Sequence, residues 1–253
     1  MHILLTNDDG YASKGINCLA KHLSKNHEVT VVAPECEMSC SSHSVNFLKG
    51  VTYRKIDNKD GICTYAVNGT PADCVLFSLC HLLKDKVVDL VVSGVNNCLN
   101  VGSDYIYSGT FGAAQEATYL RHKGVAVSLD TKNTDDYDEA CGFFADNVEK
   151  FAEFATNDIT INVNIPHTNF KDIAGVKVAP IAYRPYKESF ASQIFDDGRE
   201  VYIASGGPIS QKDSGVEDDG SCVDNGYITV TPIRLLGNCP ETLQKMRKAS
   251  FKL

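Results

Sequence analysis

The chain has 253 residues, of which 43% are hydrophobic and 22% are charged, and its formal net charge is −8 at pH 7. This balance is typical of a globular chain that can fill a core, and it excludes a disordered one. No basic cluster offers a surface for nucleic acid, and no apolar run approaches the ~20 residues of a membrane-spanning helix. We therefore expect a cytoplasmic protein with neither a nucleic-acid partner nor a membrane segment.

The ten cysteines and seven histidines form no recognisable metal or disulfide framework. The cysteines are scattered through apolar segments without a CxxC pair, and the histidines form no HExxH motif and no cluster with cysteine. We expect most of the cysteines to be buried thiols in a reducing compartment. Zinc has little support from this pattern.

The start of the chain alternates apolar strands with an amphipathic helix. Residues 2–6 form an apolar run that ends in a polar turn at residues 7–10, and apolar residues at helical spacing follow from 16 to 23. A second apolar strand spans residues 29–33 and is closed by Pro34. Continuous apolar strands joined by a helix indicate a parallel sheet that is covered on both faces.

The same alternation continues along the chain. The predicted elements are a helix at residues 72–83, a strand at 90–92, a helix at 110–121 and a strand at 125–129. We infer an α/β fold with a Rossmann-like, doubly wound, mostly parallel sheet. Ligands of such sheets bind beyond the carboxyl ends of the strands, so the loops after Thr6, Ala33 and Val92 form the candidate site.

The pattern of the core extends through the next segment. A polar stretch at residues 131–136 leads into a helix that ends near residue 155, and strands at 159–165 and 176–181 follow. We expect residues 1–183 to form a Rossmann-like catalytic core.

The last quarter of the chain has a different hydrophobic pattern. Alternating strands at residues 200–204 and 227–231 flank an acidic loop, residues 211–225, which we expect to be surface-exposed or mobile. We interpret these strands as a C-terminal β-hairpin arm for oligomerisation. A last helix at 240–249 completes this second predicted part, residues 184–253.

Two adjacent carboxylates, Asp8 and Asp9, follow the first strand. Unpaired, they repel each other, and a cation between them relieves that repulsion. The same residues are also ordinary turn formers and helix caps, so the pair alone does not distinguish a metal site from a turn.

Polar residues also follow the second and third strands. Residues 35–44 carry four serines beside His43, and hydroxyls in such a loop can bind a hard metal ion or a phosphate oxygen. Asn96 offers a carboxamide oxygen suited to Mg²⁺ or Mn²⁺. Turn preference alone also explains both loops.

A fourth loop, residues 107–110, enters a helix of small residues. Ser108, Gly109 and Thr110 stand where the free N–H groups of a helix N-terminus bind anions, although either hydroxyl can equally be a plain N-cap. A P-loop is excluded because the sequence has no GxxxxGK[ST] motif. Oxygen ligands and an anion site in one crevice predict a metal-dependent phosphatase.

Several segments resemble the SurE (stationary-phase survival protein) family of metal-dependent nucleoside monophosphate phosphatases. The matching segments are ILLTNDDG at 3–10, VVAP at 31–34, NGTPADCV at 68–75, DLVVSGVN at 89–96, YSGT at 107–110, NVNIP at 162–166 and GYITVTP at 226–232. The likeness therefore covers nearly the whole chain.

The resemblance implies particular roles. Four residues would bind one divalent metal ion per subunit, Mg²⁺ or Mn²⁺, namely Asp8, Asp9, Ser39 and Asn96. The implied substrates are nucleoside 5′- and 3′-monophosphates, and in some members short polyphosphate. The implied assembly is a homodimer or homotetramer whose C-terminal arms exchange between subunits. The chain departs from the family pattern at Cys40, where glycine is usual, and at Cys98, where a small residue is common.

The resulting hypothesis assigns catalysis to Asp8, Asp9 and Asn96. A metal-bound water attacks phosphorus in line, Asp9 assists proton removal, and residues 108–110 hold other phosphate oxygens. One alternative is an aspartyl-phosphate mechanism on Asp8, as in haloacid-dehalogenase-like enzymes, but their DxD spacing fails because position 10 is glycine. Another alternative is a non-catalytic nucleotide-binding protein.

Overall fold

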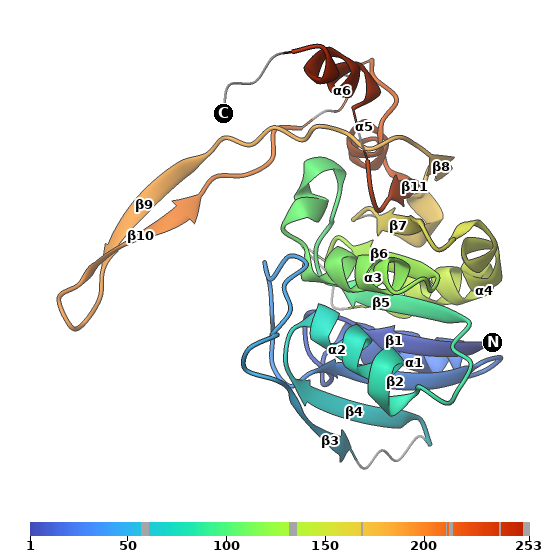
Figure 1. Ribbon diagram of the computed structural model, residues 1–253. Helices are drawn as coiled ribbons and strands as arrows, with labels where there is room; N and C mark the ends of the chain where they lie inside the picture. Colours follow the sequence, from blue (N-terminus) through green and yellow to red (C-terminus); the bar gives the residue numbers. More distant parts are fainter. Residues whose placement is uncertain are drawn as a thin grey trace.

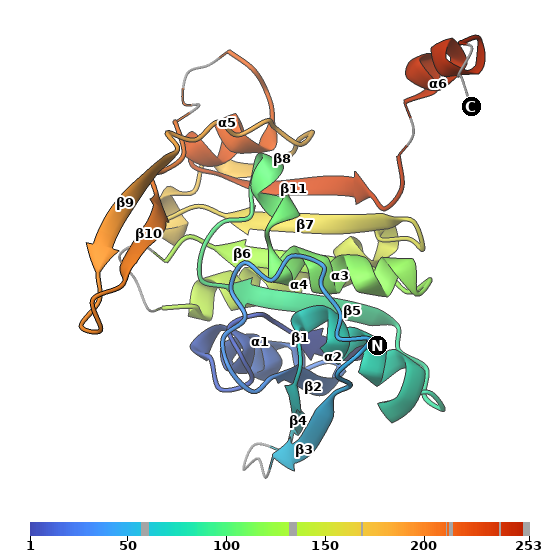
Figure 2. The same ribbon diagram turned by 60° about the vertical axis from the view of Figure 1, so that its left-hand side comes forward.

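The computed structural model describes residues 1–56, 61–131, 136–167, 169–210, 212, 215–237 and 239–249. Over these residues the centre of the molecule is a nine-stranded sheet with helices on both faces (Figure 1). A two-stranded hairpin projects from this body, and a C-terminal helix stands apart from it (Figure 2). The predicted α/β, doubly wound, mostly parallel sheet is confirmed.

The order of strands in the main sheet defines where ligands bind. Its strands are, in spatial order, β3 (Thr52–Ile56), β4 (Cys63–Asn68), β2 (Glu28–Pro34), β1 (His2–Thr6), β5 (Leu90–Asn96), β6 (Gly124–Leu129), β7 (Ile159–Ile165), β11 (Tyr227–Arg234) and β8 (Gly175–Val178). Neighbours from β4 to β7 run parallel, whereas β3 and β11 run antiparallel to β4 and β7. From β1 the chain adds β2 and β4 on one side of β1, and it then crosses to place β5 on the other side. The switch point therefore lies between β1 and β5.

Helices cover the two faces of the sheet in pairs. Helices α1 (Lys14–Leu23) and α4 (Asp138–Phe154) contact each other on one face, and α2 (Pro71–Phe77) and α3 (Gly109–Tyr119) contact each other on the other face. The remaining short helices are η1 (Ser78–Leu82), η2 (Gly102–Ile106), η3 (Phe170–Asp172), α5 (Asp219–Asp224) and α6 (Pro240–Arg247). No helix among the described residues combines the length and the apolar character needed to cross a membrane.

The side chains of β1 alternate between two hydrophobic clusters. Ile3 and Leu5 pack in the cluster that includes Leu19 of α1 and Phe144 of α4, whereas Leu4 packs in the cluster under α2 and α3. All three β1 residues are fully buried. Burial on both faces explains why the sequence of this strand is continuously apolar.

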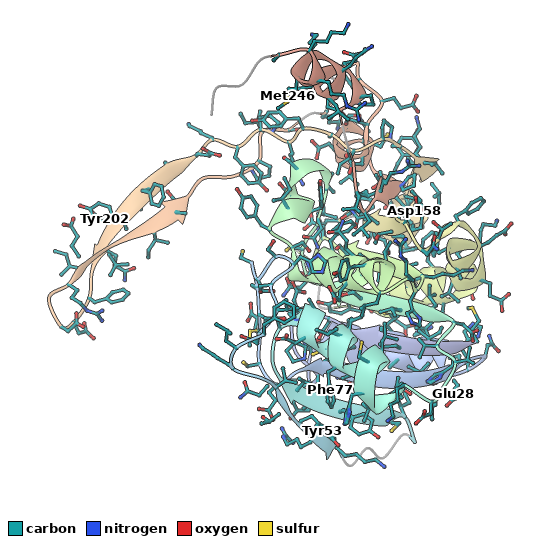
Figure 3. The ribbon with its side chains drawn as sticks, in the orientation of Figure 1. Glu28, Tyr53, Phe77, Asp158, Tyr202 and Met246 are labelled. Carbon is teal, nitrogen blue, oxygen red and sulfur yellow. The ribbon has the colours of Figure 1, made fainter. Side chains whose placement is uncertain are left out.

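Two expected elements differ in detail from the structure. The predicted helix at 72–83 begins as α2 but continues as the π-helical turn η1. Strands β3 and β4 were not among the predicted elements, and Tyr53 of β3 packs against Phe77 of α2 with ring centroids 4.9 Å apart (Figure 3). This contact lets a largely exposed edge strand cover the end of α2.

The predicted C-terminal hairpin arm is confirmed, but the strand at 227–231 is not part of it. Strand β10 (Glu200–Ser205) pairs antiparallel with β9 (Ser189–Ile194), and β11 instead pairs with β7 and β8 in the main sheet. The reason is burial: β11 buries Ile228 in the main core, whereas nearly every side chain of β9 and β10 is exposed. The division of the chain after residue 183 stays a prediction, although β11 lies in the sheet of the first part.

The expectation of an exposed or mobile loop at 211–225 is wrong for its second half. Helix α5 begins there with a capping box between Asp218 and Ser221, and Asp219 is fully buried. Asp219 tolerates burial because its carboxylate accepts hydrogen bonds from the backbone N–H groups of Gly102 and Ala182, at 2.9 and 2.7 Å. Residues 211, 213 and 214, like 132–135 of the predicted polar stretch, lie outside the described residues.

Two phenylalanines on α4 offer a direct test of this packing. Phe144 is fully buried between α4 and the sheet, whereas Phe154 is 62% exposed. We expect Phe144→Ala to lower the free energy of unfolding by about 3–5 kcal/mol, because it leaves a cavity in the core. Phe154→Ala should change it by less than about 1 kcal/mol. Urea denaturation measures both, and equal losses would contradict this placement of α4.

Candidate active site

The carboxyl ends of β1 and β5 bring Asp8, Asp9 and Asn96 together at the switch point. Asp8 and Asn96 are each 5% exposed, and Asp9 is partly buried. The carboxylate of Asp9 accepts a hydrogen bond from the backbone N–H of Asn97, which directly follows β5. The loops after two adjacent parallel strands therefore touch, as the strand-end argument requires.

Helix α3 points its N-terminus at Asp8. Thr110, the second residue of α3, donates from its backbone N–H to Asp8 Oδ2 at 3.1 Å and from its hydroxyl to Asp8 Oδ1 at 2.5 Å. These bonds fix the carboxylate and place it at the positive end of the helix dipole. Ser108 is the N-cap, because its hydroxyl oxygen accepts the Phe111 N–H at 3.0 Å.

Glycine at position 109 allows this close approach. A Cβ added there would lie 3.0 Å from both Cβ and Oδ2 of Asp8, and it would also collide with the hydroxyl of Ser41. The side chain of residue 109 must therefore be absent for α3 to meet Asp8. The three residues predicted to bind phosphate, 108–110, thus lie directly at the carboxylates.

The loop after β2 reaches the same place. The backbone N–H of Met38 donates to the carbonyl oxygen of Asp8 at 2.7 Å. Ser39 is exposed, and its hydroxyl donates to Glu37 at 2.7 Å. Cys40 has φ 59, a conformation that favours glycine and so accounts for the glycine usual there in the family. The loop that carries Ser39 is therefore tied to Asp8 through Met38.

The carboxylates at the site stabilise one another's neutral forms. Burial, followed by the charges of Asp8 and Glu37, raises the pKa of Asp9 to about 7. Burial also raises the pKa of Asp8, against the hydrogen bonds from Thr110 that lower it. The sequence analysis did not include Glu37 among the site residues. Its position two residues before Ser39 is the one sequence feature that could have indicated a role at the site. A bound cation would reverse these shifts by favouring the charged forms.

The donor atoms available here fit a hard divalent cation. Asp8 and Asp9 supply carboxylate oxygens, and Ser39 supplies a hydroxyl. The Asn96 amide nitrogen donates to the Cys98 carbonyl oxygen at 2.7 Å, which leaves the amide oxygen on the other branch of the side chain. Among the described residues, the buried hydroxyl of Ser41 beside Gly109 has no hydrogen-bond partner, so the site offers a further unused polar atom. Oxygen donors of this kind select Mg²⁺ or Mn²⁺.

Buried asparagines hold the loop that follows β5. The Asn100 N–H donates to Asn164 at 2.8 Å, its amide donates to Ser128 at 2.9 Å, and Asn162 donates to its carbonyl oxygen at 2.8 Å. This network ties the loop to β6 and β7. Sequence reasoning matched residues 162–166 to a family pattern without assigning them this role.

Two further pairs brace the surroundings of the site. The Nε2 atom of His43 lies 2.5 Å from the buried carboxylate of Glu116, which holds the serine-rich loop against α3. Arg184, at the base of the hairpin, lies 3.2 Å from Asp104, and Tyr186 donates to the same carboxylate at 2.8 Å. Sequence reasoning missed both acidic partners, because each lies far along the chain from its basic or phenolic partner.

Fold and site together define a class of protein: a doubly wound α/β protein whose strand-end carboxylates form a hard-cation site beside a helix N-terminus. The family model described as "Survival protein SurE" matches residues 3–188. The chain belongs to the SurE family, which confirms the predicted resemblance.

Relatives match over almost the whole chain. Three of these relatives are named "5'-nucleotidase SurE". The protein from Histophilus somni (strain 2336) is 39% identical and the one from Clostridium botulinum (strain Kyoto / Type A2) is 37% identical, each match covering 92% of both chains. The protein from Thermosipho melanesiensis is 36% identical over 98% of this chain and 97% of its own. The crystal structure of the SurE protein from Aquifex aeolicus matches with a TM-score of 0.82 and 34% identity over 98% of both chains.

The raised pKa of Asp9 predicts how the metal-free protein responds to pH. The folded state keeps a proton on Asp9 up to about pH 7, whereas the unfolded chain releases it near the ordinary aspartate pKa of 3.8. The folded state therefore binds more protons in this window, and stability should fall as pH rises from about 4 to 7. Urea denaturation in a chelating buffer should show a flatter profile for Asp9→Asn.

The exposed Asp146 on α4 provides the matched control for this titration. Asp146→Asn should keep the slope of the parent protein, because it lies outside the site. Identical pH profiles for Asp9→Asn and the parent would contradict the assignment of a raised pKa to Asp9.

Proposed function

We propose that this protein hydrolyses nucleoside 5′-monophosphates, and also 3′-monophosphates, to a nucleoside and inorganic phosphate, with Mg²⁺ or Mn²⁺ as its cofactor. The observation that carries the proposal is the pair of carboxylates with raised pKa values at the switch point, directly before the N-terminus of α3. The relatives named 5'-nucleotidase, aligned over more than nine-tenths of the chain, support the substrate class.

Asp8, Asp9, Asn96 and Ser39 would hold the metal ion. When bound, the ion supplies a Lewis acid that stabilises charge on the phosphoryl group and lowers the pKa of bound water. Asp8 is already oriented by two hydrogen bonds from Thr110. Ser39, which is exposed and donates to Glu37, is the most accessible of the four.

Proton removal falls to Asp9. Its carboxylate lies beside Asp8, and the cation that the two would hold favours the charged form of Asp9, which can accept a proton from water. Asn97 orients the carboxylate through its backbone N–H. Asp9 is therefore our candidate for the general base that assists attack by water.

The phosphate group would lie against the first turn of α3. A helix N-terminus attracts a dianion through its dipole and its free N–H groups, and Ser108 and Gly109 open that turn. Thr110 has a different part in the proposal. Its backbone N–H and its hydroxyl both donate to Asp8, so we propose that Thr110 positions the Asp8 carboxylate.

The exposed hairpin β9–β10 supports assembly through exchanged arms. Phe190, Ile194 and Tyr202 are 72%, 74% and 64% exposed, and Tyr202 lies on the arm far from the body (Figure 3). An isolated two-stranded hairpin is marginally stable in water, so a partner subunit would stabilise this one. We propose a homodimer or homotetramer. The ten free thiols suit a reducing compartment, and we propose the cytoplasm.

Asp8→Asn tests the reaction centre. It keeps the shape of the side chain but removes the charge at the centre of the site, so phosphate release from AMP with Mn²⁺ should fall by at least about 100-fold. The circular dichroism spectrum should be unchanged. Tight AMP binding by the parent protein without phosphate release would instead favour a non-catalytic nucleotide-binding protein.

The stereochemistry of the reaction separates the metal-activated water from an aspartyl-phosphate intermediate. A single in-line displacement by water inverts configuration at a chiral phosphate, whereas two displacements retain it. We expect inversion. Retention would make Asp8 the nucleophile and overturn the proposed role of Asp9.

Two substitutions at Thr110 distinguish the contribution of its hydroxyl group from that of its side-chain shape. Thr110→Val removes the hydroxyl donor to Asp8 and should weaken Mn²⁺ binding about 10–100-fold, because the buried carboxylate keeps only the backbone N–H of its two orienting bonds. Thr110→Ser keeps the hydroxyl and should bind Mn²⁺ nearly as tightly as the parent. Calorimetric titration with Mn²⁺ measures both, and equal weakening in the two variants would refute the positioning role.

A further inference from the structure

A second cluster of metal-binding side chain types lies between α1 and α4, on the face of the sheet opposite α3. Cys18 and His22 are four residues apart on α1, and Asp138 and Cys141 are three residues apart on α4. These spacings place both members of each pair on one face of their helix. The ligand atoms of Cys18, His22 and Asp138 all lie within 4.8 Å of one another.

The contacts of the cluster join its four members. His22 Nε2 lies 2.8 Å from Asp138 Oδ1, and the thiols of Cys18 and Cys141 are hydrogen-bonded to each other. The nearest ring atoms of His22 lie 3.7 and 3.8 Å from the position of a Cβ built on Gly142.

The cluster runs from the core to the solvent. Cys141 is fully buried, Cys18 is partly buried, and the side chains of His22 and Asp138 are 14% and 77% exposed. A cation can enter past Asp138 and reach the sulfur atoms at the inner end. Donors on two rigid helices would be held in place before the ion arrives.

The donor types and spacings suit tetrahedral coordination. Zinc binds thiolate and imidazole at about 2.0–2.3 Å, which places tetrahedral ligand atoms roughly 3.3–3.8 Å apart. The ligand atoms of Cys18, His22 and Asp138 lie within 4.8 Å of one another, so small side-chain rotations would bring these three to such distances. Cys141 lies outside that group and joins it through its contact with Cys18. We propose that Cys18, His22 and Asp138, with Cys141 as the fourth donor, bind a thiophilic divalent cation, Zn²⁺ above all.

The two sites of the molecule select different metals. The active site offers oxygen donors, which favour Mg²⁺ or Mn²⁺, whereas the site between α1 and α4 offers two sulfurs and an imidazole, which favour Zn²⁺. A zinc ion there would join α1 to α4 and stabilise the folded state, because the unfolded chain does not hold the four donors together.

Cobalt is the probe that reports thiolate ligands directly. The chelator-treated Asp8→Asn protein, whose active site is disabled, is titrated with Co²⁺, and the near-ultraviolet sulfur-to-cobalt charge-transfer band is recorded. We expect the band to saturate at one equivalent, to weaken in Cys18→Ser and in Cys141→Ser, and to disappear in the variant that carries both substitutions. His22→Gln keeps both sulfurs and should weaken Co²⁺ binding at least about tenfold.

Cys98→Ser is the matched control, because Cys98 lies beside Asn96 at the other site. It should leave the band unchanged. In parallel, Zn²⁺ at about a hundred times its Kd should raise the Tm of the Asp8→Asn protein by roughly 5–10 °C and leave that of its Cys18→Ser derivative unchanged. A band that survives in the variant lacking both Cys18 and Cys141, a band lost in Cys98→Ser, or a Cys18–Cys141 disulfide in place of any cobalt band would overturn the proposal.

Discussion

The buried carboxylate of Asp8 is the constraint around which the site is arranged. A charged group that is 5% exposed is costly unless it is hydrogen-bonded, and Thr110 supplies two donors from the first turn of α3. That contact requires α3 to approach β1 so closely that residue 109 has no room for a side chain. The main chain of Asp8 also binds Met38, so the loop after β2 is drawn to the same point. Three loops are thus positioned by the hydrogen bonds of one residue.

Much of this arrangement could be predicted from local patterns. Strands β1 and β5 are buried on both faces, so residues 3–5 and 90–92 are continuously apolar, and the polar residues Asp8 and Asn96 come a few positions later. Parallel pairing then places those residues at one edge of the sheet. The strands near the C-terminus are different: an alternation of apolar and polar residues predicts a strand but not its partner. The sequence therefore did not show that β10 pairs with β9, or that β11 pairs with β7 and β8. Their pairing depends on which of them can bury apolar side chains in the core.

Other features depend on contacts between distant segments and leave no local signature. Burial raises the pKa of Asp9 most, followed by the charges of Asp8 and of Glu37, and the fold brings Glu37 close from another loop. Likewise, Cys18 and His22 showed no motif when considered on their own, because their partners Asp138 and Cys141 lie more than a hundred residues further along the chain. Packing of α1 on α4 creates that cluster, and a sequence pattern confined to one helix cannot show it.

Helix α1 connects the two sites physically. Its entry is tied to the strand-end turn, because Asn7 donates to the Ser13 hydroxyl at 2.8 Å and to the carbonyl oxygen of Gly10 at 3.0 Å. Gly15 lies so close to the backbone of Val95 that a Cβ there would collide with it, so α1 also rests directly on β5. A cation at Cys18 would therefore fix a helix whose other end holds the turn that carries Asp8. The structure shows α1 in one position, so the cation would stabilise that position and, through it, the active site. Regulation of activity by the cation would require a second stable position of α1.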